Sequence, residues 1–137
     1  MDTTDRKIVL VTRKTRLQDM VVRYNTVEQA KFQAEHLGLD FSDFLAEDRT
    51  YAHALASVAE VLERHGRLQR LDRGFLPNFL FPPGCLVVVL GQDGLVANTL
   101  KYLDGQPLLA INPDQARWDG VLLPFNADDL PKIIREV

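Results

Sequence analysis

A short polar turn between two apolar segments holds the residues best suited to chemistry. The turn consists of Gly91, Gln92, Asp93 and Gly94, and it follows an apolar run at residues 86–90. A segment with apolar residues at helical spacing comes next. In a strand, glycine turn and helix that follow one another, the N–H groups of the first helical turn have no partner within the helix. They point at the space above the end of the strand, where a ligand, usually a phosphate, can bind. Asp93 adds a carboxylate at the same place, and glycine permits close approach of the backbone.

The same four residues also have a purely structural explanation. Asp and Gly are the commonest turn residues, and a short glycine motif by itself is weak evidence for a ligand. The chain contains no Walker motif, in which Gly-x-x-x-x-Gly-Lys precedes Ser or Thr. If the chain binds phosphate groups, we therefore expect them at the glycine turn.

Two stretches of the chain resemble the amino-terminal domain of the NAD kinase family. The first is LGQDGLVANTLKYL at residues 90–103, and the second is QPLLAINPDQARWDGVLLPF at residues 106–125. Members of this family carry a Gly-Gly-Asp-Gly turn after an apolar strand, then a strand that ends in Gly-Ile-Asn, then a Leu-Gly-Phe segment. Diacylglycerol kinases and phosphofructokinases have related turns. The turn alone therefore indicates a superfamily, and the three segments together indicate NAD kinases.

The resemblance implies roles for individual residues. Asp93 matches the family's catalytic aspartate, and Gly94 matches its neighbour in the nucleotide site. Phe125 matches the aromatic residue that lies against the bound nucleotide, and Asn112 matches the asparagine of Gly-Ile-Asn. For Asn112 an Asx-type turn is the structural alternative, because Pro113 follows it.

Four positions depart from the family pattern. Gln92 replaces the second glycine, Leu95 the usual Thr, Ala110 the glycine before Ile-Asn, and Pro124 the glycine before Phe. Gln92 adds a side chain where the backbone approaches phosphate, and Leu95 lacks a hydroxyl for phosphate binding or capping. Because the aspartate and both flanking glycines remain, we expect a divergent member of the family and not an inactive one.

The resemblance implies a phosphotransferase of NADP biosynthesis. The terminal phosphoryl group of ATP, or of polyphosphate in some members, passes to the 2′-hydroxyl of the adenosine ribose of the substrate NAD, and Mg²⁺ accompanies the donor. Asp93 would accept or orient the hydroxyl proton, while the backbone from Gly91 through Gln92 to Gly94 would cradle phosphates. Family members continue into a second, mostly β domain. Residues 1–137 are thus predicted to be an amino-terminal α/β domain that is incomplete, and inactive, without that partner domain.

Two other functions stay open. A sugar or lipid kinase of the same superfamily would share the turn but would not need the segments around Asn112 and Phe125. A non-catalytic nucleotide-binding or interaction module is compatible with Gln92 and Leu95. Because family members commonly oligomerise, the resemblance also implies a possible homo-oligomer.

Length, charge and cysteine content limit the class of protein. The chain has 137 residues, of which 46% are hydrophobic, and this suits one globular domain with its own core. A net charge of −3 provides no basic field for a nucleic acid or a membrane surface. No apolar run reaches membrane-spanning length and residues 1–5 show no signal pattern, so a cytoplasmic location is predicted. The single cysteine, Cys85, is expected to be structural, and no His or Cys cluster has metal-ligand spacing.

Hydrophobic patterning predicts the elements that must position the turn. Buried strands are expected at residues 7–12, 86–90 and 108–112, short strands at 67–71 and 120–123, and helices at 26–37, 42–65, 95–103 and 130–136. This order predicts a Rossmann-like three-layer α/β/α sandwich with a mostly parallel sheet.

Charged residues outside the turn have two interpretations. Arg13, Lys14 and Arg16 follow the first predicted strand, where loops of an open α/β sheet line the ligand crevice. These basic residues are candidates to hold a phosphate, and Lys14 is assigned to the site. Solvated surface charge is the alternative. Glu47 and Asp48 are interpreted as part of a solvated helix face.

Overall fold

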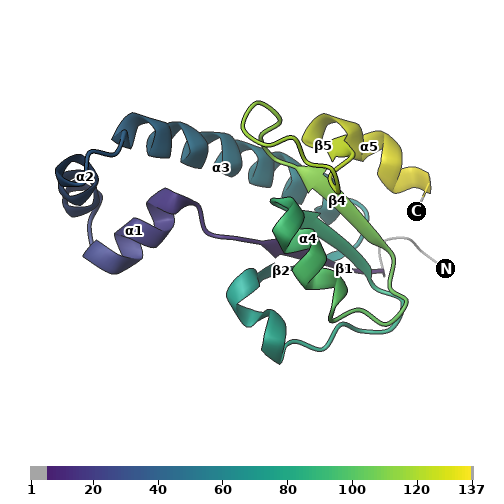
Figure 1. Cartoon of the computed structure of the whole chain (residues 1–137). Coiled ribbons are helices and arrows are strands. Elements are labelled where there is room, and N and C mark those ends of the chain that lie inside the picture. The colour runs from purple at the N-terminus through teal and green to yellow at the C-terminus, as the bar shows by residue number, and fades with distance from the viewer. Residues whose placement is uncertain (1–5, 137) are drawn as a thin grey trace. The chain divides into compact units, whose positions relative to one another are not determined.

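The chain folds into two compact units (Figure 1). A computed structural model describes residues 6–136. One unit contains the chain up to Arg13 and from Ala54 onward, and the other contains Lys14–His53. Residues 1–5, where no signal segment is expected, lie outside the described range. Within residues 6–136, no helix has the length and apolar character needed to cross a bilayer.

A sheet of five parallel strands forms the first unit. The strands are β1 (Lys7–Thr12), β2 (Arg67–Asp72), β3 (Leu86–Leu90), β4 (Leu108–Asn112) and β5 (Phe125–Asn126), and their order is β2-β1-β3-β4-β5. Val9 of β1 pairs with Gln69 on one side and with Val87 on the other. The strand order thus reverses direction between β1 and β3, and ligands of such open parallel sheets bind at this reversal, outside the carboxyl ends of the strands.

Both faces of the sheet are buried. All five residues of β3 are buried, as expected for a central parallel strand. Successive side chains of a strand point to opposite faces. On one face the core contains Val9, Val11, Val87, Val89 and two residues of helix α4 (Asp93–Leu100), Leu95 and Val96. The alternate residues Ile8, Leu10, Leu86, Val88 and Leu90 are at most 1% exposed. The predicted α/β/α fold class is confirmed.

The carboxyl-terminal part of the chain differs from the prediction in one element. Residues 120–123 are predicted as a strand, but they form a turn in which the Leu123 N–H donates to the Gly120 carbonyl at 2.9 Å. The fifth strand is the two-residue β5, which follows this turn. Helix α5 (Leu130–Ile133) and the 3-10 turn Ile134–Glu136 occupy the last predicted helix.

The second unit is helical. It contains α1 (Arg16–Tyr24), α2 (Val27–His36) and the first part of α3 (Phe41–Glu63). The sequence analysis predicts α2 and α3 but misses α1. A capping box begins α1: the Thr15 hydroxyl accepts the Gln18 N–H, and the Gln18 side chain accepts the Thr15 N–H at 2.9 Å. Thr-x-x-Gln is therefore the sequence signal from which α1 is predictable.

Candidate functional site

The glycine turn lies at the carboxyl edge of the sheet, where β3 ends and α4 begins. A Cβ atom on Gly91 would lie 2.7 Å from Cδ2 of Leu95, so a side chain there would require Leu95 to shift. A Cβ atom on Gly94 would meet nothing within 4 Å. Packing therefore explains the first glycine of the turn but not the second.

The first turn of α4 keeps main-chain donors available. Its N-cap, Gln92, makes no side-chain capping hydrogen bond, and the N–H groups of Leu95 and Val96 donate to the Gln92 carbonyl at 3.0 and 3.2 Å. Within residues 6–136, no acceptor binds the N–H groups of Asp93 and Gly94. Main-chain donors at the positive end of a helix dipole are the arrangement to which anions commonly bind.

The carboxylate of Asp93 holds the loop that follows β4. Its Oδ1 accepts the Leu122 N–H at 2.8 Å, and its Oδ2 accepts the Val121 N–H at 3.1 Å. These amides belong to the turn that Gly120 begins with a φ of +64°. Both oxygens of the proposed catalytic carboxylate thus bind main-chain donors of the loop at residues 113–124.

Asn112 anchors the beginning of the same loop. Its Nδ2 donates to the Trp118 carbonyl at 2.9 Å, and its Oδ1 accepts the Asp114 N–H at 2.9 Å. The second bond is the Asx-type turn that the sequence offers as a structural role for Asn112. A Cβ atom on Gly120 would lie only 2.7 Å from Asn112 Nδ2, so this loop folds closely over the asparagine.

Arg13 lies beside the glycine turn and contacts the loop as well. Its Cδ lies 3.6 Å from the position of a Cβ on Gly91, and its guanidinium carbon lies 4.6 Å from the centre of the Trp118 ring. The arginine is 8% exposed. A cation over an indole face is a favourable electrostatic contact. The sequence analysis includes Arg13 in a basic trio but assigns Lys14 to the site.

Two further residues are predicted for the site, Lys14 and Phe125. Lys14 is exposed and is the first residue of the helical unit. Phe125 begins β5, pairs with Ile111 in the sheet and is half-buried. The carboxyl edge of the sheet therefore brings together the glycine turn, Asp93 and Asn112, and it adds Arg13.

Comparison with known proteins identifies no family. No protein-family model matches the chain, and no curated protein matches it. A functional assignment therefore depends on the sequence motifs and on the geometry of this edge.

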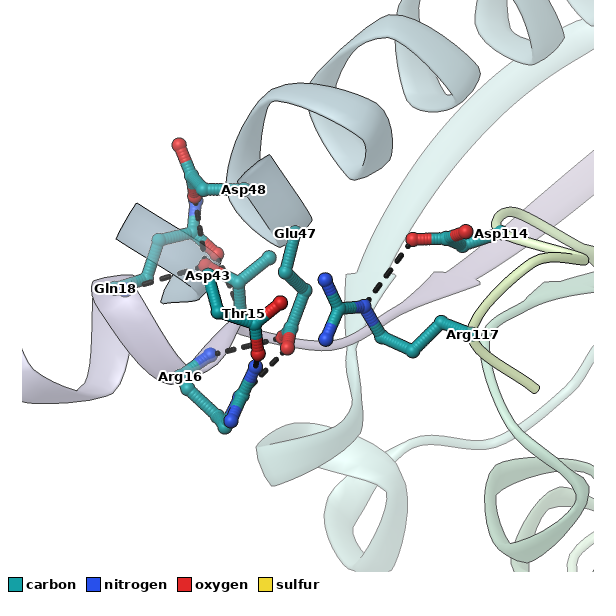
Figure 2. Close-up of polar contacts among 8 residues, drawn as sticks. All are labelled: Thr15, Arg16, Gln18, Asp43, Glu47, Asp48, Asp114 and Arg117. Carbon is teal, nitrogen blue, oxygen red and sulfur yellow. Dashed lines mark hydrogen bonds and ion pairs between the residues drawn. The ribbon is translucent and has the colours of Figure 1, made fainter. Parts of the chain in front are cut away.

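The third member of the basic trio, Arg16, belongs to an ion-pair cluster of the helical unit (Figure 2). Its Nε lies 2.6 Å from Glu47 Oε2, and its Nη2 lies 2.8 Å from Asp43 Oδ2. Desolvation acts to lower the pKa of Arg16, but hydrogen bonds to the two carboxylates and their charges outweigh it and raise the pKa. The interpretation of Glu47 as a solvated residue is wrong: its side chain is 2% exposed and accepts these bonds from α1.

A cavity of about 320 Å³ lies in the helical unit. Its lining consists of Arg16, Asp19, Met20, Arg23, Tyr24, Leu37, Leu39 and Phe44. Both signs of charge occur in its lining, and the Arg16 charge is already compensated by two carboxylates. This cavity therefore does not suit a polyanion, and the carboxyl edge of the sheet is the better candidate for a nucleotide.

Proposed function

We propose that the chain is the nucleotide-binding α/β domain of an NAD-kinase-like phosphotransferase. Nucleotide phosphates bind the N–H groups of Asp93 and Gly94, and the Asp93 carboxylate receives the proton of the acceptor hydroxyl. The observation that carries the proposal is the position of the glycine turn at the reversal of strand order between β1 and β3, with two helix-start donors available.

Gly94 supports the proposal independently. The fold has room for a side chain at this position, so packing gives no reason for glycine. Glycine costs about 0.5–1 kcal/mol relative to alanine in the interior of a helix, so it offers no stability advantage to a helix such as α4. A ligand that approaches the backbone closely would account for glycine at position 94, because the packing of the protein itself does not require it.

The reaction asks the protein mainly for positioning. Phosphoryl transfer involves little covalent chemistry by the enzyme, and Asp93 at hydrogen-bond distance from the 2′-hydroxyl of NAD supplies the acceptor for its proton. Mg²⁺ would enter with ATP or polyphosphate, because proteins usually bind this ion through one or two carboxylates together with the phosphates of the substrate. For catalysis, the Asp93 carboxylate therefore has to give up its hydrogen bonds from the Val121 and Leu122 N–H groups and accept one from the substrate hydroxyl.

A non-catalytic nucleotide-binding module is the second candidate. The hydrogen bonds from Val121 and Leu122 to Asp93 favour it, because they give the carboxylate a structural role that needs no catalysis. Binding and turnover must therefore be measured separately.

Calorimetric titration with NAD, with ATP and Mg²⁺, and with glucose tests the binding site. We expect NAD to bind the parent chain and Gly94→Ala to weaken binding at least about tenfold, or about 1.4 kcal/mol. The melting temperature of Gly94→Ala should be unchanged or higher, because the added methyl group meets open space. Asn98→Ala, in the second turn of α4, is the matched control and should bind NAD normally. Binding of glucose in place of NAD would favour a sugar kinase, and no heat with any of these ligands would exclude a nucleotide site.

An enzyme-coupled assay for NADP tests catalysis in the full-length protein, because the domain alone is expected to be inactive. General-base catalysis contributes about 10²–10⁴-fold, so Asp93→Asn should lower the rate of NADP formation by at least about 100-fold while NAD still binds. A full-length protein that binds NAD without forming NADP would support the non-catalytic module.

A further inference from the structure

We propose that residues 113–124 form a lid on the nucleotide site, and that Arg13, which the lid covers, is the side chain that takes a nucleotide phosphate when the lid moves away. This inference rests on the proposed function and extends it to the regulation of the same site. Four lid residues, Trp118, Gly120, Val121 and Leu122, make the contacts that carry it.

The lid covers both charges that a phosphoryl-transfer site uses. The amides of Val121 and Leu122 occupy the Asp93 carboxylate, and the Trp118 ring covers the Arg13 guanidinium. In this closed arrangement neither charge is presented to a substrate. Movement of one loop would therefore expose the carboxylate for the hydroxyl and the guanidinium for the phosphate together.

Leu123, near the base of the lid, is 3% exposed and packs in the sheet core, so it anchors that end, whereas polar contacts hold the tip at residues 118–122. Val121 is 86% exposed and Leu122 is 46% exposed, although both are large apolar residues. A buried apolar side chain resists displacement because its removal exposes surface to water. The contacts of the tip with Asp93 and Arg13 are different, since a nucleotide offers replacement partners to both side chains. The bond from Asn112 Nδ2 to the Trp118 carbonyl is the polar contact that lid movement has to break without such a replacement.

The two ends of the lid are fixed in the sheet. Ile111 pairs with Phe125 and Asn112 pairs with Asn126, so β4 and β5 clamp the loop at its base. A loop whose ends are held side by side can change position while the strands that carry it stay in place, as active-site lids do. Within the loop, the ion pair of Asp114 with Arg117, at 3.3 Å, adds local order (Figure 2).

Arg13 is placed to receive a phosphate from the helix start. It follows β1, its Cδ lies against Gly91, and Gly91 leads directly into the donors of α4. A guanidinium binds phosphate oxygens in a bidentate manner and brings a full positive charge, which main-chain amides lack. Nucleotide binding would thus replace the Trp118 ring by phosphate on the same cation.

Fluorescence of Trp118 reports the position of the lid, because it is the single tryptophan of the chain. We expect NAD to shift its emission to longer wavelengths and to increase quenching by acrylamide, as the ring leaves Arg13 and meets water. Val121→Pro should increase quenching without ligand, because it removes the N–H that Asp93 Oδ2 accepts. Proline is favoured at this second position of the 120–123 turn. Val121→Ala keeps the N–H and is the matched control.

A titration with inorganic pyrophosphate tests Arg13. Arg13→Gln should raise the dissociation constant at least about tenfold. Arg13→Lys should restore most of the affinity, and circular dichroism of both variants checks that they fold.

The outcomes separate the lid from the proposed function. If calorimetry detects NAD binding while Trp118 emission and quenching stay constant, the lid is excluded and the nucleotide site stands. If Val121→Pro and Val121→Ala behave alike, the Asp93 contact does not hold the lid. Unchanged pyrophosphate affinity in Arg13→Gln excludes the role of Arg13. The absence of binding to NAD, ATP and pyrophosphate overturns both proposals.

Discussion

Asp93 combines a structural contact with the proposed chemistry in one carboxylate. A side chain whose two oxygens accept two main-chain N–H groups contributes to the free energy of unfolding whether or not it acts on a substrate. A loss of activity in an Asp93 variant therefore has two possible causes, and the stability of each variant has to be measured beside its turnover.

Asp93→Asn should lower the free energy of unfolding by about 1–2 kcal/mol, since an amide has one acceptor oxygen for the two loop donors. Urea denaturation measures this loss. Asp119→Asn, an exposed position of the same loop, is the control and should change stability by less than about 0.5 kcal/mol. Equal stability of the two variants would show that the Asp93 contacts contribute nothing to the fold.

Cys85 should react slowly with thiol reagents in the folded protein. It is 2% exposed at the start of β3, and burial raises its pKa, although Lys7 and Arg6 act in the opposite direction. Because the thiolate is the reacting form, a raised pKa keeps the thiolate fraction low until the pH rises above the ordinary range for cysteine. Labelling with iodoacetamide near pH 8, with and without urea, measures this. Labelling as fast in the folded protein as in urea would contradict the burial.

At the scale of elements, the start of α1 should be more sensitive to substitution than the start of α2. The Thr15 side chain caps α1 and also donates to Asp48 at 2.7 Å, whereas Thr26 caps α2 alone. We expect Thr15→Ala to cost about 2–3 kcal/mol and Thr26→Ala about 1 kcal/mol. Helical circular dichroism during urea denaturation measures both, and a larger loss for Thr26→Ala would contradict the double role of Thr15.

The elements that could be predicted from the sequence are those with strong local patterns. Residues 7–12, 86–90 and 108–112 are apolar runs, and each is a strand with the predicted bounds. The segment 120–123 is also apolar, but the distant Asp93 carboxylate binds its amides, and the segment is a turn. No local pattern contains that contact. The same holds for Glu47, whose burial depends on a partner 31 residues away.

The residues of the candidate site divide in the same way, into those that local patterns indicate and those that depend on contacts between distant parts of the chain. The glycine turn, Asp93 and Asn112 are recognisable from residue types and spacing, and parallel topology brings them to one edge. Arg13 was distinguishable from Lys14 and Arg16 only in three dimensions, because adjacent positions in a loop are equivalent by composition. The contact of Trp118 with Arg13 joins residues far apart in sequence, so no spacing rule indicates it.

For the whole molecule, protection against hydrogen exchange should differ between the two units. Residues 8–11 of β1 and 87–89 of β3 are paired on both sides and buried, so their amides should exchange only on global unfolding. Helix α2 buries only Ala30 and Ala34, and its amides should exchange by local opening. Mass spectrometry of peptides after exchange in D₂O measures this difference. Protection of α2 equal to that of β3 would contradict it.

The parallel pairing of β1 also affects the order of events during synthesis. β1 leaves the ribosome before both of its neighbours, which begin at Arg67 and Leu86. No hairpin is open to it, because a parallel partner requires a crossover connection. The apolar side chains and main-chain groups of a nascent β1 therefore stay exposed while the helical segment is translated. During this interval the growing chain is prone to aggregate, and a chaperone would protect it.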